Sequence, residues 1–363
     1  MTPAALLPEG LRDRLPPQAD AADRLLRAVL DRVAAHGYDR VQPPMVEFEE
    51  SLAGQLLAGG RRDLLRFIDP VSQRTLALRS DITGQVGRIA ATRLAHADRP
   101  LRLSYGGTVL RVRGTQLSPA REMLQAGAEL IGRDSVAAAI EVLGIAVAAL
   151  IEAGLDRISV DLTLPDIVET LAGAMIPPDR IARLKALLDM KDAGALASEG
   201  FADWQPLLAA TGPVDTALPR LRAFDHAGLL ATRIDGVAAL AAALGNVPVT
   251  LDPTERHGFD YQSWLGFSIF AGGVRGEIGR GGTYSVRHNG GVEPAVGFSL
   301  YVDALVDAGL GVVAARRIAL PLGTAATVGA DLRAGGWITV AALDANLPSG
   351  CTHVWNGVEA VAI

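Results

Sequence analysis

The sequence predicts an α+β fold built around a largely antiparallel sheet. Segments with strand character and amphipathic segments with helical spacing occur in mixed order, without the regular strand–helix alternation of a doubly wound parallel sheet. The chain has 363 residues, of which 49% are hydrophobic and 20% charged, so it can bury a large core and is not a disordered protein. A stretch rich in alanine and leucine interrupts the strand-bearing parts and predicts a separate helical region.

The first 163 residues predict a mixture of helices and strands. Ala22, Leu26, Val29 and Val33 fall on one face of a helix expected over 21–36. The patterns that follow predict a strand over 38–41, a hairpin over 66–69 and 74–78, a helix over 82–94, strands over 101–105, 109–112 and 123–131, a helix over 135–153 and a strand over 158–162.

The character of the chain changes twice more. Residues 164–246 predict a helical insertion into a core formed by 1–163 and 247–305. The glycine-rich run Gly279–Gly282 is expected to be a tight turn between two strands of that core, because glycine adopts positive φ at little cost. Residues 306–363 predict a small β-rich extension, with strands expected over 318–320, 337–342 and 352–355.

Composition excludes several classes of protein. With 34 basic and 40 acidic residues the net charge is −6, which argues against a protein whose main task is to bind phosphate backbones. The single cysteine excludes a disulfide scaffold, and the six histidines lack metal-ligand spacing. No phosphate-binding or dinucleotide-binding glycine motif occurs, so no cofactor and no metal are expected.

Targeting signals give no reason to place the chain in a membrane. The first ten residues lack a basic region ahead of an apolar one. The most apolar stretch, 136–151, is too short to span a bilayer comfortably and contains Glu141, so we expect a buried helix. The expected compartment is therefore the cytoplasm.

One predicted strand carries a candidate binding surface. In the segment 122–132, alternation places Gln125, Gly127 and Glu129 on one face, with apolar residues on the other. The glycine leaves a gap between an amide and a carboxylate, where a small polar ligand fits; the alternative is a sheet face exposed to water. The segment Leu78–Thr83 is a second candidate, and its alternative is a simple helix start capped by a side chain.

These segments and several others resemble, in order, the histidyl-tRNA synthetase family. The matching stretches, collinear over about 8–305, are Pro8–Pro17, His36–Glu47, Leu78–Thr83, Leu110–Arg113 with Arg121–Glu129, Glu255–Tyr261, Gly281–Tyr284 and Pro294–Ser299. They resemble the opening segment, the three motifs of class II synthetases, the segment that holds the histidine amino group and the histidine-specific loop. The resemblance implies a class II aminoacyl-tRNA synthetase-like antiparallel sheet flanked by helices.

The resemblance also implies a histidine pocket. Asp81 and Thr83 would hold the α-ammonium group, and Arg111 and Gln125 would face the carboxylate. Glu129, Tyr261 and Tyr284 would line the imidazole side. Such paired, hydrogen-bonded partners are what a buried zwitterion with a polar ring requires. Asp81 is one methylene shorter than the family's usual glutamate, and Gln262 stands where the family usually has a second tyrosine, so the imidazole contacts near 262–266 differ in detail.

The nucleotide half of the implied site departs from the family. Ala304 and His257 occupy positions where a synthetase has arginines, and Arg113 occupies the position of an acidic residue. Aminoacyl transfer passes through a highly charged phosphate centre, and loss of cationic donors there costs orders of magnitude in rate. We therefore expect no aminoacylation activity and no catalytic residues of its own.

A synthetase-like chain with a histidine pocket but a disabled nucleotide site resembles the regulatory subunits of ATP phosphoribosyltransferase. That resemblance implies a homodimer within a hetero-octamer with the short catalytic subunit, no tRNA partner and feedback inhibition by L-histidine in histidine biosynthesis. The short stretch after Leu305 has no room for a full anticodon-binding domain, which agrees with the expected absence of tRNA. Two alternatives stay open: a divergent histidine-activating enzyme, with Arg280 or Arg113 replacing the missing arginine, and a structural dimer with a vestigial pocket.

Overall fold

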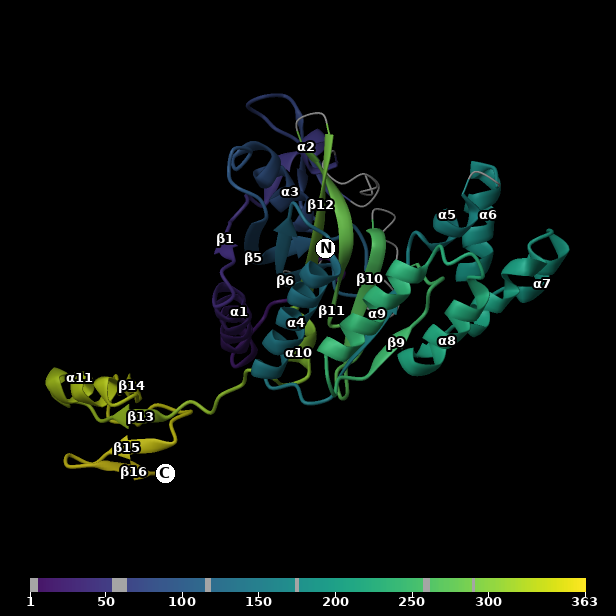
Figure 1. Ribbon diagram of the computed structural model, residues 1–363. Coiled ribbons are helices and arrows are strands. Elements are labelled where there is room, and N and C mark those ends of the chain that lie inside the picture. Colours follow the sequence, from purple (N-terminus) through teal and green to yellow (C-terminus); the bar gives the residue numbers. More distant parts are fainter. Residues whose placement is uncertain (1–5, 54–63, 115–118, 174–175, 257–261, 289–290) are drawn as a thin grey trace. The chain divides into compact units, whose positions relative to one another are not determined.

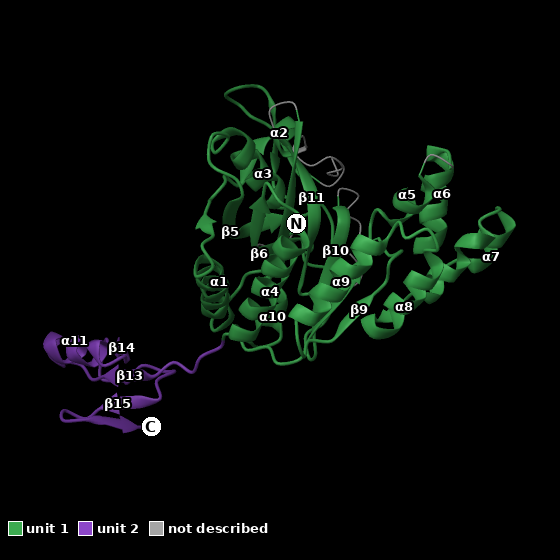
Figure 2. Cartoon of the chain, viewed as in Figure 1, with its two compact units in different colours: residues 1–311 green, residues 312–363 purple. Residues whose placement is uncertain are grey.

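The protein folds into two compact units. The computed structural model describes residues 6–53, 64–114, 119–173, 176–256, 262–288 and 291–363 (Figure 1). Contacts divide the chain into residues 1–311 and residues 312–363 (Figure 2). The first unit contains the segments that resemble the synthetase motifs, so it contains every candidate site residue.

A large, mostly antiparallel sheet forms the middle of the first unit. Its strand order is β1-β5-β6-β12-β11-β10-β7-β9-β8, and only the pairs β1–β5 and β7–β9 are parallel. The predicted α+β class with a largely antiparallel sheet is confirmed. The bounds are β1 Asp39–Arg40, β5 Leu101–Leu110, β6 Glu122–Ile131, β7 Ile158–Thr163, β8 Gly212–Pro213, β9 Val249–Leu251, β10 Gln262–Ala271, β11 Gly279–His288 and β12 Gly291–Tyr301.

Helices cover both faces of this sheet. Successive side chains of a strand point to opposite faces, and both faces carry apolar side chains that pack against helices. On one face Ala126, Ala128 and Leu130 of β6 join the apolar faces of α1 and α4 in the main core. On the other face Val86 and Ala90 of α3 form a second core with neighbouring strands. The bounds of these helices are α1 Gln18–Ala34, α3 Thr83–Thr92, α4 Val136–Glu152 and α10 Val302–Asp307, the last packing against α1.

Two sequence-based expectations at glycines are wrong. The strands expected over 101–105 and 109–112 are one continuous strand, β5, and Gly279–Gly282 lies inside strand β11, with no turn there. In both places the glycine lies within the strand and lets a neighbouring segment pack closely against the backbone. A Cβ on Gly106 would lie 2.7 Å from Leu26 of α1, and a Cβ on Gly281 would lie 2.2 Å from the carbonyl oxygen of Gly297.

Apart from the short strands β8 and β9, the described region between β7 and β10 is mainly helical, and it buries Leu184, Leu187 and Leu188 of α6 in the main core. An ion pair joins it to the strand-bearing part, where Lys191 Nζ lies 2.6 Å from Asp252 Oδ1. The elements are α5 Ile167–Ala172, α6 Pro178–Asp189, α7 Ala193–Ser198, a 3₁₀ helix over Ala202–Ala209, α8 Val214–Phe224 and α9 Ala231–Ala243.

Two small sheets complete the fold. In the first unit β2 (Val46–Phe48), β4 (Thr75–Leu78) and β3 (Arg66–Ile68) form a three-stranded sheet beside α2 (Glu49–Ala53). The second unit contains a four-stranded sheet in the order β14-β13-β15-β16, with helix α11. Its bounds are β13 Arg317–Leu320, α11 Ala326–Ala334, β14 Ile338–Ala341, β15 His353–Trp355 and β16 Ala360–Ala362. The sequence patterns did not predict α11 or β16.

No helix among the described residues combines the length and the apolar character that crossing a bilayer requires. The most apolar helix is α4, whose Glu141 pairs with Arg102 and accepts a hydrogen bond from Tyr38.

A pair of glycine substitutions tests how tightly the sheet is packed. A Cβ on Gly127 in β6 would lie 2.2 Å from the carbonyl oxygen of Phe298 and 2.4 Å from the hydroxyl of Tyr105. Gly127→Ala should therefore lower the free energy of unfolding by about 1–3 kcal/mol or more. Gly144 in α4 has nothing within 4 Å of a Cβ, so Gly144→Ala should raise stability by about 0.5–1 kcal/mol. Urea unfolding of both variants measures the contrast, and equal effects would contradict it.

Candidate functional site

A polar pocket lies against the central sheet where β6, β12 and β11 run side by side. Its cavity volume is about 30 Å³, which is room for about two water molecules. The pocket is lined by Asp81, Thr83, Glu129, Gln262, Arg280, Gly281, Gly282, Tyr284, Gly297, Phe298 and Ser299. Four predicted site residues are in this lining: Asp81, Thr83, Glu129 and Tyr284.

Glu129 lies at the bottom of the pocket with only 1% of its surface exposed. Its Oε1 accepts a hydrogen bond from the Tyr105 hydroxyl at 3.1 Å, and its Oε2 accepts one from the Tyr284 hydroxyl at 2.7 Å. Glu129 pairs with Gly297 across the two strands, and a Cβ on Gly297 would come within 1.6 Å of Oε2. The carboxyl group therefore occupies space that only a glycine leaves open.

Burial changes the protonation of this carboxyl group. Removal from water raises the pKa of Glu129 to about 8, and the nearby charge of Asp81 acts in the same direction. Hydrogen bonds from Tyr284, Thr83 and Tyr105 oppose the shift without cancelling it. At neutral pH the pocket therefore presents a mostly protonated carboxyl group, which can donate a hydrogen bond to a ligand.

The turn Asp81–Thr83 closes the pocket from the side of α3. Asp81 Oδ1 accepts a hydrogen bond from the backbone N–H of Thr83 at 2.7 Å, so the turn carries its own cap. Buried Gln125 donates from Nε2 to Asp81 Oδ2 at 2.9 Å, and its Oε1 accepts from the backbone N–H of Ile82 at 3.1 Å. Gln125 thus holds the turn against β6, and its side chain is occupied with residues of this chain.

Besides Gln125, which the described lining does not include, two predicted residues are still to be placed, Arg111 and Tyr261. Arg111 follows β5 and bonds through its backbone to Arg121, and the pocket lining does not include it. Its charge does act on Tyr301 at the end of β12, whose pKa burial raises to about 12. Tyr261 lies outside the described residues. The assignment of all seven predicted residues to a histidine site stays a prediction.

The pocket also contains groups that the sequence did not assign to it. Arg280 of β11 forms an ion pair with Glu277, whose second oxygen accepts a hydrogen bond from Ser268 at 2.8 Å. Arg280 therefore faces the pocket with its charge already paired. The spacing of three residues between Glu277 and Arg280 does not by itself predict an ion pair, because the two side chains meet only at the start of β11.

Two further groups, Ser299 and Tyr105, connect the pocket into one network. Ser299 Oγ accepts a hydrogen bond from Gln125 Nε2 at 2.6 Å and lies 2.9 Å from the Tyr105 hydroxyl. Tyr105 is fully buried and also lies 3.1 Å from Thr83 Oγ1. Tyr105 pairs with Gly127 in the sheet register. Its side chain therefore fills the gap at Gly127 where the sequence predicted room for a ligand.

The chemistry available here is that of a binding site. The described lining offers hydrogen-bond donors and acceptors of both charges in a largely buried setting. Among the residues whose placement is described, no three His, Cys, Asp or Glu side chains come together to hold a metal ion. Ala304, at the position of the synthetases' arginine, lies in α10 and packs against the main core.

Comparison with known proteins agrees with this arrangement. The family model described as histidyl-tRNA synthetase matches residues 10–305. A protein of Rhodospirillum rubrum named ATP phosphoribosyltransferase regulatory subunit is 44% identical over 96% of this chain and 95% of its own length.

Two solved structures share the fold. One, from Bacillus halodurans, is described as an ATP phosphoribosyltransferase regulatory subunit/histidyl-tRNA synthetase; it has a TM-score of 0.80 at 23% identity, over 93% of this chain and 92% of that chain. A chain of the ATP phosphoribosyl transferase (HisG:HisZ) complex of Thermotoga maritima has a TM-score of 0.62 at 20% identity, over 77% of this chain and 97% of that chain.

The raised pKa of Glu129 predicts a pH dependence of stability. The folded pKa, about 8, lies above the value near 4.5 expected for the unfolded chain, so folding takes up a proton between these limits. The stabilisation that the protonated Glu129 contributes is complete below pH 4.5 and is lost as pH rises through 8. Between these limits the free energy of unfolding falls by up to about 1.4 kcal/mol per pH unit.

The test compares Glu129→Gln, which cannot titrate, with the parent chain in denaturant unfolding from pH 5 to pH 9. The stability of the parent relative to the variant should fall from pH 5 to about pH 8 and level off above that pH. A difference between the two that does not change with pH would show that Glu129 stays ionised in the folded protein.

Proposed function

The chain belongs to the family of ATP phosphoribosyltransferase regulatory subunits, and on that premise we propose that its pocket binds free L-histidine and makes the partner enzyme sensitive to it. Its function is that of a non-catalytic subunit of ATP phosphoribosyltransferase in histidine biosynthesis, and its partner is the catalytic subunit. The observation that carries the histidine proposal is Glu129, a buried carboxyl group held by two tyrosines at the bottom of a polar pocket.

Free histidine matches the groups that line the pocket. The carboxylate of Asp81, half-buried at the rim, suits an α-ammonium group, and Thr83 adds a hydroxyl beside it. At the other end the protonated Glu129 can donate to an imidazole nitrogen, or share its proton to form a charge-assisted pair. Arg111 and Gln125, toward the ligand's carboxylate, and Tyr261, toward its ring, complete the proposed set.

Entry of an amino acid requires the pocket to widen, because about 30 Å³ does not hold one. Gln262 is the side chain best placed to move. Its Nε2 donates to the carbonyl oxygen of Gly281 at 2.8 Å, and its amide lies over Gly266 and Gly282, within 3 Å of where a Cβ on either would be. We propose that histidine displaces this amide. Binding then couples to a change at β10 and β11, which is what feedback regulation needs.

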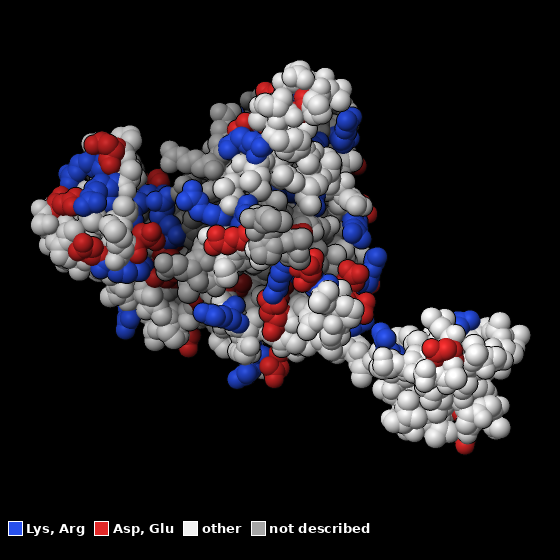
Figure 3. Space-filling view, turned by 180° about the vertical axis from the view of Figure 1, so that it is seen from behind, with Lys and Arg blue, Asp and Glu red and all other residues white. Residues whose placement is uncertain are grey.

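The regulation itself is a linkage between two ligands of one complex. Histidine inhibits only if it binds the inhibited arrangement of the complex more tightly than the active one. We propose that this complex is a hetero-octamer of regulatory dimers and catalytic subunits in the cytoplasm, without tRNA. On the face seen in Figure 3 acidic and basic side chains are interspersed, which is unlike a surface that binds phosphate backbones.

Histidine should raise the melting temperature of the isolated chain, since a ligand that binds only the folded state stabilises it. Asp81→Ala should weaken histidine binding about tenfold or more. Glu129→Gln should do the same, because an amide cannot give its proton to the imidazole and form a charge-assisted pair. A pull-down with a short ATP phosphoribosyltransferase should stay unchanged for both variants. Glu122→Gln is the matched control, because Glu122 lies exposed on the same strand as Glu129.

In the reconstituted complex, histidine should lower the phosphoribosyltransferase activity of the parent and leave the complex with Glu129→Gln much less inhibited. Wild-type binding by both site variants would show that the residues are wrongly assigned. No thermal shift at millimolar histidine would favour a vestigial pocket, and robust histidine-dependent ATP–pyrophosphate exchange by the pure chain would favour the activating enzyme.

A further inference from the structure

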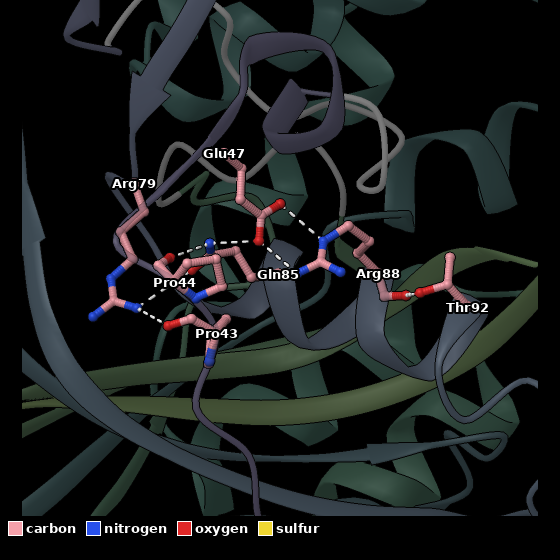
Figure 4. Close-up of polar contacts among 7 residues, drawn as sticks. All are labelled: Pro43, Pro44, Glu47, Arg79, Gln85, Arg88 and Thr92. Atoms are coloured by element: carbon pink, nitrogen blue, oxygen red, sulfur yellow. Dashed lines mark hydrogen bonds and ion pairs between the residues drawn. The ribbon is translucent and has the colours of Figure 1, made fainter. Parts of the chain in front are cut away.

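A buried arginine, Arg79, directly follows β4, two residues before the turn that lines the pocket. Arg79 is only 7% exposed, and its guanidinium group is turned toward Pro43 (Figure 4). Its Nε donates to the carbonyl oxygen of Thr108 at 2.7 Å, and its Nη1 donates to that of Pro43 at 3.0 Å. Arg79 therefore joins three segments that are distant in sequence: the proline pair Pro43–Pro44, β4 and β5.

Burial of this charge has a cost that a merely apolar side chain would avoid. Removal from water lowers the pKa of Arg79, and the charge of Glu47 only partly opposes that shift. The hydrogen bonds that the structure gives Arg79 lead to two backbone carbonyls and, at 3.5 Å, to the amide of Gln85, with no carboxylate among them. Acceptors from separate segments fix the orientation of the rigid guanidinium fork, so the arrangement points to a geometric role.

Gln85 extends this arrangement into α3. Its Nε2 donates to the carbonyl oxygen of Pro44 at 2.8 Å and to Glu47 Oε1 at 2.8 Å (Figure 4). Glu47 is in turn paired with Arg88. The proline pair, the first turn of α3 and β2 are thus tied together around Arg79.

The turn that lines the pocket lies between Arg79 and Gln125. The backbone of Arg79 bonds to Met45 on one side and to Leu110 on the other, two residues before Asp81. A Cβ on Gly107 would lie 2.4 Å from Arg79 Nη2, and Gly107 pairs with Gln125 in the sheet. The guanidinium group and the Gln125 amide are therefore neighbours on one face of the sheet, and each fixes one end of the turn.

We propose that Arg79 is a positioning residue for the ligand pocket: it touches no ligand, and it sets the affinity by holding the Asp81–Thr83 turn against β5 and the proline pair. This proposal rests on the proposed histidine function. It assigns to Arg79 an effect on histidine sensitivity that is separate from assembly of the complex and from the activity of the partner enzyme.

The test measures histidine inhibition of the reconstituted complex with Arg79→Met, Arg79→Lys and Arg88→Met. Arg79→Met should raise the histidine concentration for half-maximal inhibition about ten- to a hundredfold, since a displacement of about 1 Å in a site has effects of that size. Arg79→Lys, which keeps the charge but not the fork of donors, should give a smaller shift. Arg88→Met, in the same network but without a contact to the turn, should stay within about twofold of the parent.

Activity without histidine separates positioning from a general loss of structure. It should change less than about twofold in all three variants, so that only the response to histidine moves. A parent-like response of Arg79→Met, an equal shift in Arg88→Met, or a parallel loss of uninhibited activity would each overturn the proposal. Gly107→Ala is an independent variant with the same expected shift, because its methyl group would displace the guanidinium group.

Hydrogen exchange of the full chain without ligand tests the claim independently of histidine. The amides of Ile82 and Thr83 are bonded to Gln125 and Asp81, so the peptide that contains them should exchange faster in Arg79→Met than in the parent. Unchanged exchange would overturn the positioning role. If the parent complex ignores histidine, the proposed function fails by itself, and the exchange measurement still decides the role of Arg79.

Discussion

Polar side chains on one face of the central sheet lie in space that neighbouring glycines leave open, and the pocket depends on this constraint. Glu129 lies over Gly297, the Tyr105 hydroxyl over Gly127, and the guanidinium group of Arg79 over Gly107, each at a distance that a Cβ would turn into a clash. If larger residues stood at these glycine positions, their side chains would fill the space that these polar groups occupy, and the sheet would have no pocket there. The glycines therefore make room on the sheet for the polar side chains that form the pocket.

The same constraint explains the electrostatics of the pocket. A carboxyl group pressed against the sheet has no access to water, so it is held by tyrosine hydroxyls and keeps its proton near neutral pH. Arg280, which faces the same pocket from β11, has its charge paired with Glu277. The pocket thus presents hydrogen-bonding groups of low net charge, which suits recognition of a small zwitterion and does not supply the concentrated positive charge that a triphosphate needs.

This arrangement fits a subunit that senses a metabolite and leaves the chemistry to its partner. In the proposed function an amino acid binds between the Asp81–Thr83 turn and the sheet, and both are continuous with strands and helices of the core. A small ligand that pushes these elements apart changes the packing of the whole layer, because packed cores shift between discrete arrangements and do not deform gradually. Family membership therefore agrees with the physical character of the site.

Local patterns in the sequence determined the α+β class, the approximate bounds of β4, α3 and β6 near the site, and the face of β6 that carries Gln125 and Glu129. They could do so because alternation and helical spacing are properties of neighbouring residues. The family resemblance added which residues to examine. Tertiary structure alone decided that Gly106 and Gly107 continue a strand, that Tyr105 fills the gap at Gly127, and that Arg79 stands behind the turn. Those outcomes depend on side chains from distant segments that approach a glycine, and no spacing within one segment contains that information.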